Sequence, residues 1–475
     1  MPPIARPTTA CCDVARPLVR VAGLLAATAF AALAGCASLP AIEPDLIPPR
    51  AAALPIDGAH GPLSAPRARG VLARLAASAP YTGIFDRHLA REEALTGSPL
   101  TAGNDARLLQ DGPATYAAML EAIAGARDHV NLETYILEDD EVGRRFADAL
   151  LERQAAGVQV NLLRDSAGTF DTPAAFFQRL VERGVRVLEF NPVNPLQARR
   201  EWLWNRRDHR KLLIVDGRVA FLGGINISSV YSGGSSAKKQ AGGDAARPWR
   251  DTDLRLEGPV VAELQKMFLA TWSQQSGAAL PQAEWFPPPR AAGRELVRAI
   301  GSAPEEPYSQ IYETLLSALD AAQTSVHITV AYFAPDPQLL EAFEAAAGRG
   351  VDVRLILPAH TDSWLVFHAG RRHYDRLLSA GVRIFERRDV ILHSKTALVD
   401  GVWATIGSTN LDWRSFLHNR EVNAVVLGTG FGAQVQAMFE RDLENSDEVT
   451  LAAWRSRGPG ARLAEWFAAG WEYWL

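Results

Sequence analysis

Two stretches of nearly the same pattern occur in this chain of 475 residues. HRKLLIVDG begins at His209, and HSKTALVDG begins at His393, 184 residues later. In each stretch a lysine follows the histidine by two positions and an aspartate follows it by seven. The six motif residues are His209, Lys211 and Asp216 in the first stretch and His393, Lys395 and Asp400 in the second.

These residue types suit phosphoryl transfer without a metal ion or other cofactor. Side chains two residues apart on an extended chain point to one face, so each histidine projects together with its lysine. If the two stretches converge, one neutral imidazole can attack phosphorus while the other, as imidazolium, protonates the leaving alcohol. We expect the lysines and the amides of Asn226 and Asn410, ten residues beyond each aspartate, to neutralise the phosphate oxygens. A single His-x-Lys is more often a surface pair, so the interpretation depends on the duplication.

The aspartates of the two motifs have a second explanation. Asp216 and Asp400 each precede a glycine between two apolar runs, which is a strong hairpin signal. Aspartate is common in such turns for conformational reasons alone. We count both with the catalytic motif but expect them to hold its shape rather than to do chemistry.

The segments around the motifs repeat as well. A helical pattern over 116–126 precedes an alternating strand pattern over 130–137, and the same unit recurs over 311–322 and 326–333. AAGVQVNLLRD and VERGVRVLEF in the first half match GRGVDVRLILP and LSAGVRIFER in the second. Alternating helices and strands predict an α/β fold, with a sheet flanked by helices in each half. The proline-rich 285–290 is the expected boundary between domains at 105–290 and 291–475.

Composition and charge narrow the functional classes. The chain is 48% hydrophobic and 22% charged, as expected of a globular protein large enough for two domains. The net charge of −5 offers no general attraction for nucleic acid, so we expect no nucleic-acid partner.

The first 35 residues resemble a secretory signal peptide. Three arginines precede the apolar run 21–35, which is shorter than the roughly 20 residues that a membrane span requires. Leu33 to Cys36 resembles a bacterial lipobox, which predicts lipidation of Cys36; an ordinary signal sequence or an uncleaved anchor is the alternative. The residue after Cys36 is alanine, not the aspartate typical of inner-membrane retention. We therefore expect a periplasm-facing lipoprotein, at the outer membrane rather than the inner membrane.

Cleavage has two consequences for the mature chain. Cys11 and Cys12 leave with the signal peptide, so no internal disulfide is expected. Removing residues 1–35 takes away three arginines and one aspartate, which lowers the net charge from −5 to −7. Residues 36–104 form the expected N-terminal segment, in which the seven prolines of 40–66 predict an extended tether.

The chain resembles the phospholipase D superfamily. Its hallmark HxKxxxxD occurs here as HRKLLIVD and HSKTALVD, followed by GGIN and GSTN. LETYILEDDEVGRRFADAL and GSTNLDWRSFLHNREVN are most similar to bacterial cardiolipin synthases of this superfamily. The resemblance implies a duplicated fold with the active site at a pseudo-two-fold interface. It also implies that two phosphatidyl lipids combine through a covalent phosphatidyl-histidine, with release of a headgroup alcohol.

The resemblance also implies a carboxylate behind each catalytic histidine. Counting back seven residues from Gly258 and Gly428 assigns these roles to Asp251 and Glu421. Such a carboxylate would orient the imidazole and stabilise its charged form; solvated surface acids are the alternative reading of the spacing. The resemblance suggests His209 as the nucleophile and His393 as the acid, although the near-symmetry of the motifs leaves the order open.

Several features indicate a membrane surface as partner, each with a structural alternative. Trp202 and Trp204 lie among arginines before the first motif, which suits a lipid headgroup region. The last 22 residues hold four of the twelve tryptophans, which predicts either a helix with an interfacial side or a helix packed on the body. The segment 232–247 is rich in glycine and serine, and we expect either a lid over the phosphate site or a plain insertion. The remaining clustered histidines, expected on a helix face or cleft lip rather than at zinc, are His360, His368 and His373.

We expect cardiolipin synthesis from phospholipid substrates. A phospholipase D that hydrolyses phospholipids to phosphatidic acid is the close alternative, because water can attack the same intermediate. A nuclease is disfavoured by the acidic charge, and a catalytically inactive membrane-binding protein would not need both histidine motifs. The donor and acceptor lipids and the oligomeric state are left open.

Overall fold

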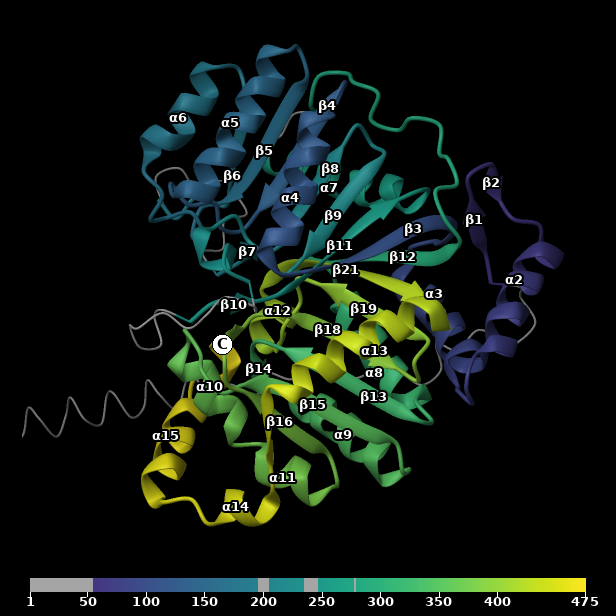
Figure 1. The fold of residues 1–475 in the computed structure, drawn as a ribbon, viewed down its shortest axis with the longest axis vertical. Coiled ribbons are helices and arrows are strands. Elements are labelled where there is room, and N and C mark those ends of the chain that lie inside the picture. Colours follow the sequence, from purple (N-terminus) through teal and green to yellow (C-terminus); the bar gives the residue numbers. More distant parts are fainter. Residues whose placement is uncertain (1–53, 195–204, 235–246, 277–278) are drawn as a thin grey trace, which may run out of the picture. The chain divides into compact units, whose positions relative to one another are not determined.

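The computed structural model describes residues 54–194, 205–234, 247–276 and 279–475 (Figure 1). These residues belong to one compact unit, 42–475. The signal peptide, Cys36, Trp202, Trp204 and most of 232–247 lie outside the described residues.

The first half is an α/β unit around a mixed sheet. Three strands are parallel to one another, and three antiparallel strands continue the sheet from β4. The parallel strands are β4 (His129–Thr134), β5 (Gln159–Asp165) and β6 (Arg186–Phe190), and the antiparallel ones are β8 (Leu212–Val215), β9 (Val219–Gly223) and β11 (Thr252–Glu257). The accompanying helices are α4 (Asp111–Ala124), α5 (Glu141–Ala155), α6 (Ala174–Glu182) and α7 (Val260–Ser276).

The second half repeats this order. Its parallel strands are β13 (Ser325–Val330), β15 (Asp352–Pro358) and β16 (Arg383–Arg387), and its antiparallel strands are β18 (Lys395–Val399), β19 (Trp403–Gly407) and β21 (Asn419–Leu427). Its helices include α8 (Gln310–Ala321), α9 (Pro337–Gly348), α10 (Trp364–Arg371), α11 (Tyr374–Ser379) and α13 (Thr429–Glu444). The duplication expected from the sequence is therefore present strand by strand. Gly157 and Gly350 end equivalent helices at positive φ, a conformation that glycine adopts without strain.

Two strands join the halves. β3 (Leu100–Gln110) pairs with β11 on one side and with β12 (Glu295–Ser302) on the other, and β12 pairs with β21. Figure 1 shows this junction, where blue and teal strands of the first half meet green and yellow strands of the second. The two expected sheets are thus linked edge to edge.

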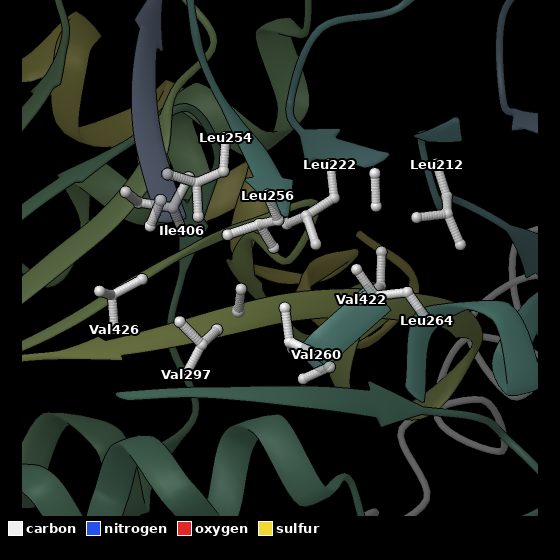
Figure 2. Close-up of a cluster of buried hydrophobic side chains, with 14 of the residues drawn as sticks. Leu212, Leu222, Leu254, Leu256, Val260, Leu264, Val297, Ile406, Val422 and Val426 are labelled. Carbon is white, nitrogen blue, oxygen red and sulfur yellow. The ribbon is translucent and has the colours of Figure 1, made fainter. Parts of the chain in front are cut away.

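One buried hydrophobic cluster draws on both halves. Figure 2 shows Leu254 and Leu256 of β11 in the same cluster as Val422 and Val426 of β21, with Val260 of α7 among them. All five side chains are fully buried. Because burying such side chains is worth about 1.5–3 kcal/mol each, this shared cluster helps to hold the two halves together.

The N-terminal segment differs from the expectation. The tether predicted over 40–66 is wrong for the part that the structure describes, because β1 (Ile56–Gly58) pairs with β2 (Gly61–Pro62) and lies parallel to β3. Ile56 is fully buried, so its hydrophobic burial outweighs the local proline content. α2 (Ala65–Ser78) and α3 (Leu89–Thr96) follow.

The C-terminal segment packs on the second half. After β22 (Ser446–Val449), α14 (Leu451–Arg455) buries Trp454, and α15 (Pro459–Ala469) packs against α10 with Ala468 fully buried. The packed helix of the two alternatives is therefore present, although much of its aromatic side stays exposed. Among the helices of the described ranges, none is long and apolar enough to cross a membrane.

Candidate active site

Short crossed strands bring the two histidine motifs together. β7 (Arg207–Asp208), just before the first motif, lies parallel to the start of β21 in the second half. β10 (Trp249–Arg250) of the first half lies parallel to β17 (Ile391–Leu392), just before the second motif. The His209 amide donates to the Arg420 carbonyl at 3.0 Å, and the His393 amide donates to the Arg250 carbonyl at 2.8 Å. Each histidine is therefore fixed to the backbone of the opposite half.

The carboxylates are exchanged between the halves in the same way. Nδ1 of His209 lies 3.0 Å from Oε1 and 3.1 Å from Oε2 of Glu421. Nδ1 of His393 lies 2.7 Å from Oδ2 of Asp251. Both carboxylates are fully buried. With Nδ1–H held by a carboxylate, each imidazole directs Nε2 away from its orienting partner, as a nucleophile or acid requires.

The two lysines lie inside this cluster. Lys211 and Lys395 are 2% and 3% exposed, and each donates to the carbonyl of the histidine two residues before it, over 2.6 Å for Lys211. Tyr135 packs against His209 with ring centroids 4.9 Å apart, and Tyr332 packs against His393 at 5.9 Å. The same two tyrosine rings lie 5.1 Å from Nζ of Lys211 and 6.0 Å from Nζ of Lys395. An ammonium, an imidazole and a phenol ring are thus repeated about the pseudo-two-fold axis.

Burial and like charges shift the protonation of the histidines. Burial, with the ammonium groups of Lys211 and Lys395 next, lowers the pKa of His209 well below its ordinary value. Burial and Lys395 also lower the pKa of His393, but the Asp251 carboxylate and its hydrogen bond oppose that shift. Both imidazoles therefore have lowered pKa values, and at His393 the Asp251 carboxylate acts against the shift.

The lysines and Glu421 have strongly shifted pKa values. Burial lowers the pKa of Lys211 to about 7 and that of Lys395 to about 8. Burial also raises the pKa of Glu421 to about 7, although the Lys211 charge acts in the opposite direction. Such shifts are common where charged groups are gathered in a site that excludes water.

The two carboxylates are supported differently. Ser408 and Asn419 both donate to the Glu421 carboxylate. At the position equivalent to Ser408 the first half has Gly224, whose missing Cβ would lie only 2.3 Å from Oδ1 of Asp251. The longer glutamate is paired with a serine donor, and the shorter aspartate approaches a glycine.

A tyrosine distinguishes His393 from His209. The Tyr231 hydroxyl lies 3.2 Å from Nδ1 of His393 and accepts from the Asn226 amide at 3.2 Å. Oδ1 of Asn226 accepts from the Ile136 amide, so this side chain is oriented by contacts in its own half. Asn410 is also buried, and within the described residues its carbonyl oxygen has no hydrogen-bond partner.

The structure does not bring Asp216 and Asp400 into the cluster. Both have positive φ in hairpin turns, at the opposite ends of β8 and β18 from the histidines. The Asp216 carboxylate accepts from the backbone amides of residues 127–129, and the Asp400 carboxylate from those of residues 323–325. The grouping of Asp216 and Asp400 with the catalytic residues is therefore corrected. Both are positioning residues, because a carboxylate that closes a turn is remote from a phosphate bound between the histidines.

Sequence reasoning missed several of these side chains. Tyr135 and Tyr332 lie near the ends of the repeated strand patterns 130–137 and 326–333, so their recurrence in both halves was the available signal. Ser408 and Tyr231 have no such signal, because their roles depend on contacts with residues far away in the chain. Of the clustered histidines, His368 packs against Trp364, and His373 pairs with Glu472 at 2.5 Å.

Comparison with known proteins identifies the family. The model described as "Cardiolipin synthase, PLD-like domain" matches residues 119–232 and 315–443. A cardiolipin synthase of a Geobacillus species is 34% identical over 371 residues, which cover 78% of this chain and 72% of that protein. The chain belongs to the phospholipase D-like cardiolipin synthase family. Cardiolipin synthase A of Pseudomonas aeruginosa is 36% identical over 356 residues, covering 75% of this chain and 70% of that one.

Solved structures support the fold of the family. The crystal structure of phosphatidylserine synthase from Haemophilus influenzae matches with a TM-score of 0.59 at 14% identity, covering 81% of this chain and 99% of that chain. At this identity the likeness shows the fold alone. The phospholipase D fold and the cardiolipin synthase relatives together make the chain an enzyme of the phospholipase D type.

Proposed function

We propose that the protein is a phosphatidyltransferase that makes cardiolipin from two phosphatidyl lipids. The observation that supports it best is the crossed pair of His209–Glu421 and His393–Asp251 with a buried lysine beside each histidine. Two imidazoles held by carboxylates provide a nucleophile and an acid within one site. The relatives named cardiolipin synthase support the choice of product.

The first step forms a covalent intermediate. Nε2 of neutral His209 attacks the phosphorus of one phosphatidyl lipid, and a P–N bond forms as the bond to the headgroup oxygen breaks. Nε2–H of the His393 imidazolium gives its proton to that oxygen, and the headgroup leaves as an alcohol, which is glycerol when the donor is phosphatidylglycerol. The lowered pKa of His209 and the Asp251 contact of His393 support this assignment of roles.

The second step transfers the phosphatidyl group. His393, now neutral, takes the proton from the hydroxyl of a second phosphatidyl lipid, whose oxygen attacks phosphorus as the P–N bond to His209 breaks. Lys211 and Lys395, with the amides of Asn226 and Asn410, would stabilise the charge on the phosphate oxygens in both steps. Their positive charge serves where a metal ion would otherwise be needed, so the proposed reaction is metal-independent.

Lipid mass spectrometry on the full chain tests the proposal. With vesicles of phosphatidylglycerol and phosphatidylethanolamine in chelator, we expect cardiolipin and the released alcohol as products. Phosphatidic acid as the sole product would show that water is the acceptor and that the protein is a hydrolytic phospholipase D.

Variants test the two histidine roles. His209→Ala and His393→Ala should both abolish turnover, because the first removes the nucleophile and the second removes the group that protonates the leaving headgroup. His60→Ala, at an exposed position outside the site, is the matched control and should keep full turnover. Turnover that survives either catalytic substitution would refute the mechanism.

We also propose that Cys36 is lipidated and that the enzyme faces the periplasm, at the outer membrane. The lipobox-like residues 33–36 support this. Labelled palmitate should enter the wild-type chain and not Cys36→Ala, and fractionation should place the labelled protein with outer membranes.

A further inference from the structure

Exposed hydrophobic side chains concentrate at the C-terminal end of the fold. In the described parts of the chain, six of the twelve most exposed large hydrophobic residues lie on α15, just after it, or at the start of α10. Trp466 is 73% exposed and Leu463 is 66% exposed. We call this set the aromatic surface: Trp364, Leu463, Trp466, Phe467, Trp471 and Trp474.

Part of the aromatic surface lies over a packed base. Trp364 of α10 and Phe467 of α15 have ring centroids 6.3 Å apart. Beneath them, Ala468 packs with Val366 and Ala369 of α10 in a buried cluster. The helix is therefore already docked through one side, and its other side displays side chains that are costly to leave in water.

Intermediate residues link this surface to the surroundings of both catalytic histidines. Tyr332, whose ring contacts His393, packs against the same cluster that seats α15. At the chain end, the Trp474 ring is stacked on His418, with centroids 6.5 Å apart and an interplanar angle of 11°. His418 precedes Asn419, which donates to Glu421. Short chains of contacts therefore connect the aromatic surface to the partners of both catalytic histidines.

The charges around the aromatic surface favour an anionic partner. Arg372 and Arg462 are exposed, and within the described ranges neither has a carboxylate at ion-pair distance. Of the acidic groups there, Glu465 of α15 is ion-paired with Arg457, and Glu472 lies within hydrogen-bond distance of His373. Asp362, two residues before Trp364, is exposed and accepts from the Tyr332 hydroxyl. Arg462, which precedes Leu463 and lies one helical turn before Trp466, therefore places an exposed guanidinium charge at the aromatic surface.

We propose that the aromatic surface inserts into the interfacial layer of a bilayer that contains anionic phospholipid, holding the active site over the headgroups. Tryptophan is favoured at the membrane interface, and arginine is attracted to anionic lipid. The inference rests on the proposed function, because a phosphatidyl substrate keeps its acyl chains in the bilayer while its phosphate must reach His209. Insertion next to the site meets both needs.

A fluorescence experiment on the full chain measures insertion without requiring turnover. Vesicles of phosphatidylglycerol and phosphatidylcholine with brominated acyl chains should quench the tryptophan fluorescence of the wild type. The triple variant Leu463→Ser/Trp466→Ser/Phe467→Ser should partition into the vesicles at least about tenfold more weakly than the wild type. Burying even one large hydrophobic side chain can change a partition coefficient by about that factor. Tyr81→Ser is the matched control, because Tyr81 is 78% exposed next to Thr82, which binds the remote Asp400 turn.

Turnover on two forms of substrate completes the test. The triple variant should lose turnover on vesicles and keep it on short-chain phosphatidylglycerol below its micelle concentration. Unchanged quenching and vesicle turnover would overturn the inference, as would equal loss on both substrates, which would mean that these side chains serve the fold. The inference would also be overturned if the wild type were a dimer, the triple variant were a monomer, and both were quenched equally. That result would assign the aromatic surface to contact with a second copy of the chain. If the wild type is quenched but turns over neither substrate, insertion stands and the proposed function fails.

Discussion

Raising the pH from 7 to 9 should sharply reduce kcat/KM, because the two site lysines lose their charge. Burial lowers the pKa of Lys211 to about 7 and that of Lys395 to about 8. At pH 9 roughly 1% of Lys211 and roughly 10% of Lys395 would still be protonated. If phosphate binding requires both charges, the competent fraction of free enzyme falls from about 45% at pH 7 to about 0.1% at pH 9, which is roughly 450-fold.

The sign of the effect follows from the charge state that binds phosphate. The protonated lysine is the active form, so activity is present below the lysine pKa values and is lost as the pH rises through them. The lowered pKa of His209 leaves that imidazole neutral from pH 7 upward, so the histidine nucleophile does not produce the alkaline loss. The acid His393 also loses its proton as the pH rises, but its pKa is lowered below the ordinary value, so this loss precedes the titration of the lysines. An ordinary exposed lysine titrates near pH 10.4 and would leave kcat/KM flat to about pH 9.

The assay is initial-rate turnover of monomeric short-chain phosphatidylglycerol from about pH 6 to about pH 10, where kcat/KM reports the free enzyme. In Lys395→Met the alkaline limb of the pH profile should become less steep by one proton. Its midpoint should move to higher pH, because the Lys395 charge that lowers the pKa of Lys211 is gone. Lys266→Met, at an exposed position paired with Glu263, should keep the wild-type profile. Flat kcat/KM between pH 7 and 9, or an unchanged limb in Lys395→Met, would refute the reasoning.

Three further substitutions test the supporting geometry. Glu421→Gln should lower kcat about 10²–10⁴-fold, because an amide can donate to Nδ1 of the imidazole it faces and select the wrong tautomer. Gly224→Ala should lower kcat while Gly348→Ala does not, since only the first places a Cβ against Asp251, 2.3 Å from its Oδ1. Asp400→Ala should lower the free energy of unfolding by about 3 kcal/mol or more, because several backbone amides lose their acceptor, and should leave kcat of the folded enzyme nearly unchanged.

Each of these expectations has a measurement and a contrary result. Steady-state kinetics on protein of matched folded fraction test the first two; equal kcat in Glu421→Gln and wild type would remove the tautomer role. Equal kcat in the two glycine variants would mean that Asp251 can move without cost. Urea unfolding tests Asp400→Ala. A large fall in kcat with an unchanged free energy of unfolding would mean that Asp400 takes part in catalysis.

Much of the site was predictable because short sequence motifs encode it and each motif occurs in both halves. The spacing of histidine and lysine is set by a few residues of extended chain, and the Asp-Gly turns are encoded by adjacent residues. Repetition then distinguished the motif from a chance surface pair, and the same repetition predicted equivalent sheets in the two halves. The helix expected over 116–126 was found as α4, although it begins at Asp111.

Other expectations failed where long-range burial overrides local composition. The prolines of 40–66 predicted an extended tether, whereas Ile56 is buried and its strand pairs with β3. The C-terminal helix could be read as packed or as interfacial from its periodicity alone. The fold shows one side packed and the other exposed, because only neighbouring elements decide which side of an amphipathic helix is covered.

The sequence by itself determined the duplicated α/β architecture, the two histidine motifs and the residue types available for acid, base and phosphate contact. Only the tertiary structure decided that Glu421 orients His209 while Asp251 orients His393, because that exchange depends on β7 and β10 crossing between the halves. It also decided the protonation of the lysines, since a pKa is set by burial and by charges brought close in space. Local spacing can encode which groups are present, but contacts across more than a hundred residues determine what each group does.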